Sequence, residues 1–170
     1  MASGRTGLVE ACLNGSIERV CAVVDATPPD HQLYAHCIAI HAAVDALANQ
    51  SPLPEAYRKI KRALKKPVPD AEILLLSMQY ASLLAIRMHR LEEARRMFRL
   101  IRQFDSQPVR PEIHAATLLA QASLQEVLAD YGPAARLIGQ ARALKVRKPS
   151  VFWVSLKSYE AYYAIYGHDF

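Results

Sequence analysis

The side chains best suited to hold a metal ion lie in the first quarter of the chain. Cys37 and His41 stand four residues apart, with His31 and His36 nearby. On a helix this spacing places two side chains on one face, so Cys37 and His41 could contact the same ion. A closed zinc site needs four ligands on a recognisable framework, and the sequence holds no CxxC pair. We therefore expect neither a metal site nor a cofactor.

Sequence motifs of the common enzyme classes are absent. The chain contains no glycine-rich phosphate loop, no GxSxG and no HExxH, and no nucleophile, base and acid fall at a spacing that predicts a catalytic trio. The three cysteines, Cys12, Cys21 and Cys37, lie in apolar stretches, where a thiol behaves as a small hydrophobic side chain. We expect a protein without catalytic activity in a reducing compartment.

Two basic stretches carry the charge that binding to a nucleic-acid backbone requires. They span residues 58–66 and 95–102 and contain Arg58, Lys59, Lys61, Arg62, Lys65 and Lys66, then Arg95, Arg96, Arg99 and Arg102. The second stretch follows Glu92 and Glu93, which can pair with arginines three and four residues further on. We expect a solvated outer face here. Nucleic-acid binding through these stretches is the alternative function.

Aromatic residues gather near the C-terminus. They are Phe152, Trp153, Tyr159, Tyr162, Tyr163 and Tyr166. On a single helix these side chains cannot all face the core, and Trp and Tyr are the residues that most often anchor interfaces. We predict that Trp153, Tyr159 and Tyr163 form a partner-binding aromatic face. Packing against the preceding helices is the alternative.

The ten prolines divide the chain into segments that read as helices. An interior proline costs a helix about 3 kcal/mol, so prolines mark helix boundaries. Between them, apolar residues recur at helical spacing. The predicted helices are residues 16–27, 30–48, 54–66, 70–89, 91–106, 111–129, 133–147 and 150–166.

A repeat runs through these predicted helices. Arg90-Leu91-Glu92-Glu93-Ala94 returns 40 residues later as Asp130-Tyr131-Gly132-Pro133-Ala134, and the match continues along one helical face. The pattern appears earlier at Gly15 to Val20 and, more weakly, at Glu55 to Ile60. The predicted anchor positions are 17, 57, 91 and 131.

The turn Asp130-Tyr131-Gly132-Pro133-Ala134 resembles the tetratricopeptide repeat, because an alanine follows three residues after the aromatic residue and further apolar residues follow at helical spacing. The resemblance covers nearly the whole chain, although Met78 and Leu118 stand where the family usually has a large aromatic residue. It implies an all-α fold, a right-handed superhelix of about four helix-turn-helix repeats (an α-solenoid). We expect residues 1–170 to form a single repeat domain, or a fragment of a longer array.

The resemblance also implies a partner-binding groove lined by the first helix of each repeat. The residues it places there are Leu76, Gln79, Leu83, Ile86, Leu119, Ser123 and Glu126. Such an apolar groove suits a helix or an extended segment of another protein. Ordinary core packing is the alternative for each residue. We therefore expect a scaffold, chaperone or sensor module that binds a protein partner.

Composition and termini suggest a soluble cytoplasmic protein. The N-terminus lacks a secretory signal, and the most apolar segment, Ile73 to Ile86, is shorter than the roughly 18 to 20 residues of a membrane span. The net charge of +5 permits an acidic partner without demanding one. We expect no membrane association and no nucleic-acid partner, and we expect self-association into homo-oligomers through open ends of the repeat array.

Overall fold

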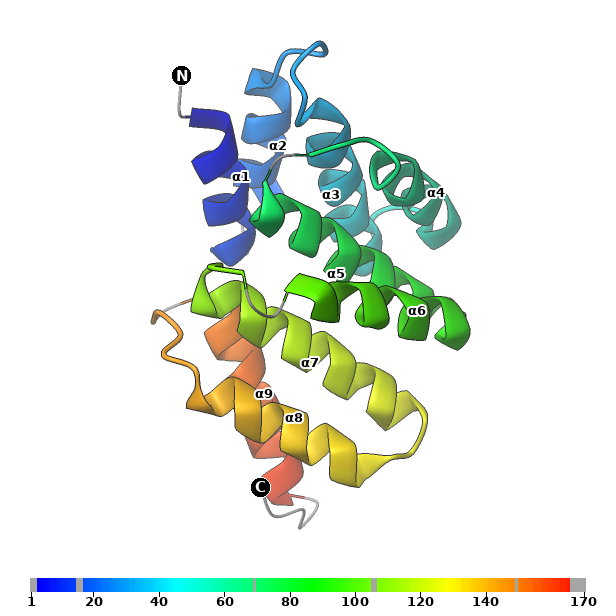
Figure 1. The fold of residues 1–170 in the computed structure, drawn as a ribbon, viewed down its shortest axis with the longest axis vertical. Coiled ribbons are helices and arrows are strands. Elements are labelled where there is room, and N and C mark those ends of the chain that lie inside the picture. The colour runs from blue at the N-terminus through cyan, green and yellow to red at the C-terminus, as the bar shows by residue number, and fades with distance from the viewer. Residues whose placement is uncertain (1–2, 15–16, 69, 105–106, 149, 166–170) are drawn as a thin grey trace. The chain divides into compact units, whose positions relative to one another are not determined.

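The computed structural model describes residues 3–14, 17–68, 70–104, 107–148 and 150–165 (Figure 1). Within these ranges the chain forms nine α-helices and one 3-10 turn, with no strand, which confirms the predicted all-α class. The helices are α1 (Ser3–Leu13), α2 (Ile17–Ala26), α3 (Tyr34–Leu47), α4 (Leu53–Ala63), α5 (Ala71–Arg87), α6 (Leu91–Ile101), α7 (Pro111–Val127), α8 (Tyr131–Ala143) and α9 (Val151–Ile165). The 3-10 turn, η1 (Arg102–Phe104), extends α6.

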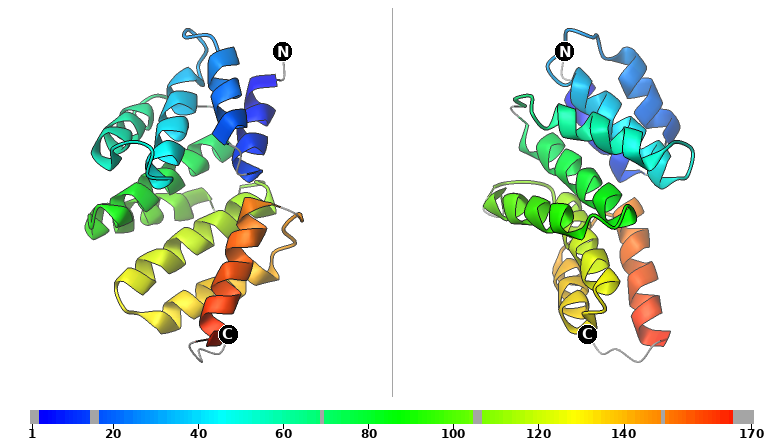
Figure 2. Two further views of the ribbon diagram at one scale, coloured as in Figure 1. Left: turned by 180° about the vertical axis from the view of Figure 1, so that it is seen from behind. Right: turned by 90° about the vertical axis from the view of Figure 1, so that its right-hand side faces the viewer.

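The chain divides into two compact units, Met1–Gln107 and Pro108–Phe170. In the first unit, α1 packs on α2, α3 on α4 and α5 on α6, and α3 also contacts α2 and α5. In the second unit, α7 and α8 form a hairpin, and α9 lies against both of them (Figure 2). The helices thus pack as hairpins of consecutive elements.

The sequence explains where several helices begin. Pro111 is the first residue of α7 and Pro54 the second residue of α4, positions that need no backbone N–H. Asp70 caps α5, because its Oδ1 accepts hydrogen bonds of 2.9 and 3.1 Å from the backbone N–H groups of Glu72 and Ile73. Most predicted helices therefore start and end within a few residues of the observed ones.

The same left-handed turn follows three of the helices. Its central residue lies two positions beyond the end of α3, α5 or α7 and has a positive φ: 60° at Asn49, 56° at His89 and 57° at Ala129. The N–H of the next residue then bonds the carbonyl five positions back, from Gln50 to Asp45, Arg90 to Ala85 and Asp130 to Gln125. The turn recurs every 40 residues, and none of the three positions is a glycine.

The second helices of the four hairpins begin at residues 17, 53, 91 and 131, at intervals of 36, 38 and 40 residues. The predicted anchor at residue 57 was wrong by four positions, because a shift of about one helical turn places the same side chains on one helical face and so leaves the periodic pattern nearly unchanged. The fourth residue of each second helix is small and at most 2% exposed: Val20, Ala56, Ala94 and Ala134. Small side chains here let the two helices of a hairpin approach closely.

Each unit has its own buried apolar contacts. In the second unit the core combines Leu119 of α7, Ile138 of α8 and Leu156 of α9 with five alanines of α7 and α8. In the first unit, α5 contributes many of the buried side chains, since α1, α3, α4 and α6 all contact it. Among the described residues no helix has the length and apolar character to cross a membrane.

Candidate functional site

The groove residues predicted on α5 lie mostly in the core of the first unit. Leu76, Gln79 and Ile86 are buried, and Leu83 is partly exposed. The reason is the crowding of α5, because four other helices contact it. These buried side chains offer little surface for a partner protein.

The groove residues predicted on α7 divide differently. Leu119 is buried, whereas Ser123 and Glu126 are partly exposed on the side where α9 packs. Ser123 Oγ lies in a short hydrogen bond with the hydroxyl of Tyr159, which comes from α9. The structure therefore brings together two residues predicted for the groove and one predicted for the aromatic face.

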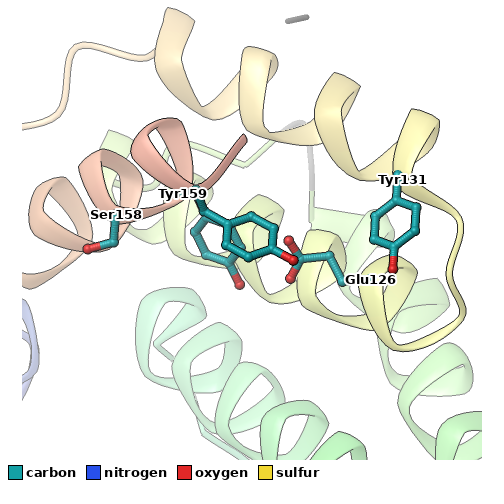
Figure 3. Close-up of a pocket in the computed structure, with 5 residues that line it drawn as sticks. Glu126, Tyr131, Ser158 and Tyr159 are labelled. Atoms are coloured by element: carbon teal, nitrogen blue, oxygen red, sulfur yellow. The ribbon is translucent and has the colours of Figure 1, made fainter. Parts of the chain in front are cut away.

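A pocket of about 420 Å³ opens beside this contact in the second unit. The described residues that line it are Glu126 of α7, Tyr131 of α8, and Ser158, Tyr159 and Tyr162 of α9 (Figure 3). Figure 3 shows the carboxylate of Glu126 lying between the side chains of Tyr159 and Tyr131. The pocket therefore combines three aromatic rings with one carboxylate.

The electrostatics of this pocket favour a cationic group. Burial raises the pKa of Tyr159, and the nearby charge of Glu126 raises it further, whereas the hydrogen bond with Ser123 opposes the shift. Tyr159 thus stays a neutral phenol at physiological pH. Aromatic ring faces and a carboxylate both attract an ammonium or guanidinium group, worth about 0.5–2 kcal/mol per ring depending on desolvation.

The other residues of the predicted aromatic face behave differently from Tyr159. The Trp153 side chain is partly exposed, and the ammonium of Lys148 lies 5.6 Å from its ring centroid. The backbone N–H of Trp153 donates to Ser150 Oγ over 3.1 Å, which anchors the start of α9. The side chain of Tyr163 lies outside the part of the chain that the structure describes.

The two basic stretches lie on α4 and α6 and the turns that follow them, and every member is exposed. Glu93 joins the two helices: its Oε2 accepts a 2.6 Å hydrogen bond from the hydroxyl of Tyr57 and lies 3.9 Å from Lys61 Nζ. Lys59 pairs with Glu55 at 2.9 Å, and Arg95 pairs with Glu92 at 2.5 Å. The carboxylates therefore neutralise part of this charge, as the sequence indicated.

A thiol, an imidazole and a carboxylate meet between α2 and α3, an arrangement that the sequence did not reveal. Cys21 Sγ lies 3.0 Å from His41 Nε2, and the same nitrogen lies 3.4 Å from Asp45 Oδ2. The spacing in sequence pairs His41 with Cys37, but Cys37 is buried, and its burial raises the pKa of its thiol. Among the described residues, no three His, Cys, Asp or Glu side chains gather with the geometry of a metal site.

The other two cysteines are core residues, as expected. Cys12 is 2% exposed, and burial raises the pKa of its thiol to about 12, with its hydrogen bond to Tyr80 opposing the shift. Cys21 alone of the three is partly exposed. Its partner could not be found from sequence, because Cys21 and His41 are 20 residues apart on separate helices.

Comparison with models of known protein families, with curated proteins and with solved structures finds no match to this chain.

Proposed function

We propose that this chain is a non-catalytic protein-interaction module of tetratricopeptide-like repeats, a scaffold, chaperone or sensor domain. Three features support the repeat: consecutive helical hairpins, left-handed turns 40 residues apart, and a small buried residue at the fourth position of each second helix. In this proposal the hairpins stack into a right-handed superhelix in the cytoplasm.

The observation that carries the proposal is the pocket and the apolar surface around it. Among the residues that the structure describes, most of the exposed large apolar side chains belong to the second unit: Val127, Tyr131, Val154, Tyr162 and Ile165. Tyr131 and Tyr162 also line the pocket, and Val127 adjoins Glu126. Exposed apolar side chains that adjoin a pocket are typical of interaction sites. We therefore place the partner on the second unit, not on α5.

We further propose that the partner is a protein segment that inserts a lysine or arginine side chain into this pocket. The chemistry is complementary, because three tyrosine rings and the Glu126 carboxylate line it. The apolar residues around the pocket would contact the aliphatic stem and the neighbouring side chains of the segment.

Fluorescence anisotropy with labelled peptide pools tests this proposal. Three pools of random dodecapeptides differ mainly in charge. The basic pool is enriched in lysine and leucine, the acidic pool in glutamate and leucine, and the neutral pool in leucine and serine. The basic pool should bind about tenfold more tightly than the other two. Glu126→Gln should remove this preference, and Tyr131→Ala should weaken binding overall. Leu100→Ala, at an exposed apolar position of the first unit, is the matched control and should change nothing.

Equal binding of the basic and acidic pools would contradict the cationic occupant but not a protein partner. Absence of binding to any pool at millimolar peptide would contradict the whole function. The proposal also includes self-association through α9, where Val154 and Ile165 are exposed. A Trp153→Ala, Tyr163→Ala double variant should then sediment closer to a monomer than the unmodified chain does.

Nucleic-acid binding is the second candidate, favoured by one specific contact. The hydrogen bond from Tyr57 to Glu93 links α4 to α6. The exposed lysines and arginines of residues 58–66 and 95–102 therefore lie on helices that contact each other. Binding of random-sequence RNA should then fall steeply between 50 and 200 mM salt, by about a factor of a thousand or more if six phosphates are contacted. No binding at about 50 mM salt would eliminate this candidate.

A further inference from the structure

Cys21, His41 and Asp45 form a second site, in the first unit, that the proposed function does not use. Cys21 lies on α2, and His41 and Asp45 lie one turn apart on α3. The side chains of His41 and Asp45 are 29% and 22% exposed, and Cys21 is partly exposed. The three residues therefore lie in a part of the first unit that is partly open to solvent.

The geometry matches the requirements for an activated nucleophile. A thiol is reactive as its thiolate, and an adjacent imidazole within hydrogen-bond distance can take the proton. His41 Nε2 is 3.0 Å from Cys21 Sγ, and the Asp45 carboxylate, 3.4 Å from the same nitrogen, would stabilise the resulting imidazolium by its charge. Asp45 contacts the same nitrogen as the thiol, so it acts as a counter-ion for His41 and does not orient it through Nδ1.

We propose that Cys21 is a site of thiol–disulfide exchange that takes low-molecular-weight disulfides, activated by His41 and Asp45. In the reaction the Cys21 proton moves to His41 Nε2, and the thiolate attacks one sulfur of the disulfide. A mixed disulfide forms on Cys21 as the bond of the incoming disulfide breaks, and the leaving thiolate takes up a proton. The incoming disulfide is the oxidant. The reaction modifies the protein once and is reversed by excess thiol.

The other two cysteines provide internal controls within the same molecule. Cys12 and Cys37 are each at most 2% exposed, and burial raises the pKa of both thiols, so both should be inert in the native protein. They become accessible only on unfolding. One reagent applied to one sample therefore reports an activated thiol and two buried thiols together.

The first experiment needs no variant. The full chain reacts at neutral pH with a neutral dipyridyl disulfide, which is not repelled by Asp45, and mass spectrometry of peptides gives the rate at each cysteine. In unfolded chain an ordinary cysteine is only about 3% thiolate at pH 7. We expect Cys21 to react about tenfold faster in the native protein than in urea-unfolded protein, whereas Cys12 and Cys37 react more slowly. A thiol that is merely exposed would react no faster when native.

Variants then assign the activation to its residues. His41→Gln should reduce the native rate at Cys21 to that of the unfolded chain or below, and Asp45→Asn should reduce it about threefold. Circular dichroism checks that each variant is folded. If His41→Gln does not fold, the native-to-unfolded rate ratio and Asp45→Asn still decide. A native rate at Cys21 no higher than the unfolded rate, or one unchanged by both substitutions, would overturn the proposal.

Discussion

The hydroxyl of Tyr57 on α4 donates a 2.6 Å hydrogen bond to the carboxylate of Glu93 on α6. The two residues belong to successive second helices and are 36 positions apart. The contact lowers the pKa of Glu93, mainly through this hydrogen bond and also through the charges of Lys61 and Arg90. It therefore links two hairpins of the first unit, and the link is stronger when Glu93 is ionised.

Tyr57→Phe should lower the free energy of unfolding by about 0.5–1 kcal/mol at pH 7. This is less than the roughly 1.5–3 kcal/mol of a buried bond to a charged group, because Glu93 is partly exposed. A carboxyl group whose pKa is lower in the folded state stabilises above its unfolded pKa, and this stabilisation is lost as pH falls through the folded value. The difference from the unmodified protein should thus shrink between about pH 5 and 3. Urea unfolding of both proteins at pH 5 and at pH 3 measures this difference in the free energy of unfolding. A difference that is the same at both pH values would contradict a stabilising bond to ionised Glu93.

Ala129→Gly should stabilise the protein by about 0.5–1 kcal/mol, although glycine usually destabilises. Ala129 has φ of 57°, where an L side chain crowds the backbone and glycine does not. The matched control is Ala161→Gly at an exposed position within α9, which should destabilise by about 0.5–1 kcal/mol. Thermal unfolding of the two variants should therefore shift in opposite directions.

Ala134→Leu should destabilise the protein by about 1–3 kcal/mol, because Ala134 has no exposed surface and lies in the core that α7, α8 and α9 share. Ala143→Leu, exposed at the last position of α8, adds the same atoms where space is open. It should change the free energy of unfolding by less than about 0.5 kcal/mol. Similar losses from both substitutions would show that the small residue at position 134 is not required for packing.

His36 should make the protein less stable in mild acid. It is buried, with Nδ1 2.9 Å from Ser77 Oγ, and burial lowers its pKa, although the backbone of Lys66 opposes part of the shift. Below about pH 6.5 the unfolded chain gains a proton that the native state does not accept, so stability falls with pH at up to about 1.4 kcal/mol per unit. His36→Gln should flatten the change in urea midpoint between pH 7.5 and 5.5, and an unchanged slope would assign the effect to other groups.

Local features of the sequence were enough to predict eight of the described helices, α2 to α9, whereas α1 (Ser3–Leu13) lies outside the predicted ranges. Pro54 and Pro111 mark helix starts, and the spacing of Ala94 and Ala134 predicts two second helices whose fourth residue is buried. The anchor at residue 57 failed by four positions, because a shift of one helical turn keeps the same helical face and the periodic pattern matches almost as well. Helical periodicity therefore does not fix the start of a helix to within one turn.

The candidate site residues were harder to predict, because their surroundings depend on which helices pack together. Leu76 and Gln79 share a helical face that sequence alone can assign equally to core or groove, and the four neighbours of α5 bury it. The sequence predicts Glu126 for the groove and Tyr159 for the aromatic face, and the packing of α9 on α7 brings both to one pocket. Cys21 and His41 meet only because α2 packs on α3.

The exposed lysines and arginines of α4, α6 and the turns that follow them should govern how the protein adsorbs to a negatively charged surface. Ten lysines and arginines lie within residues 58–66 and 95–102, although the whole chain has a net charge of only +5. An uneven charge distribution gives the molecule an electric dipole that turns it before contact. On a sulfonate resin the protein should therefore adsorb through these two helices and elute at a higher salt concentration than its net charge suggests. Variants in which Arg62 and Arg99 are replaced by glutamate should elute earlier than variants of the same net charge whose two substitutions lie outside these helices.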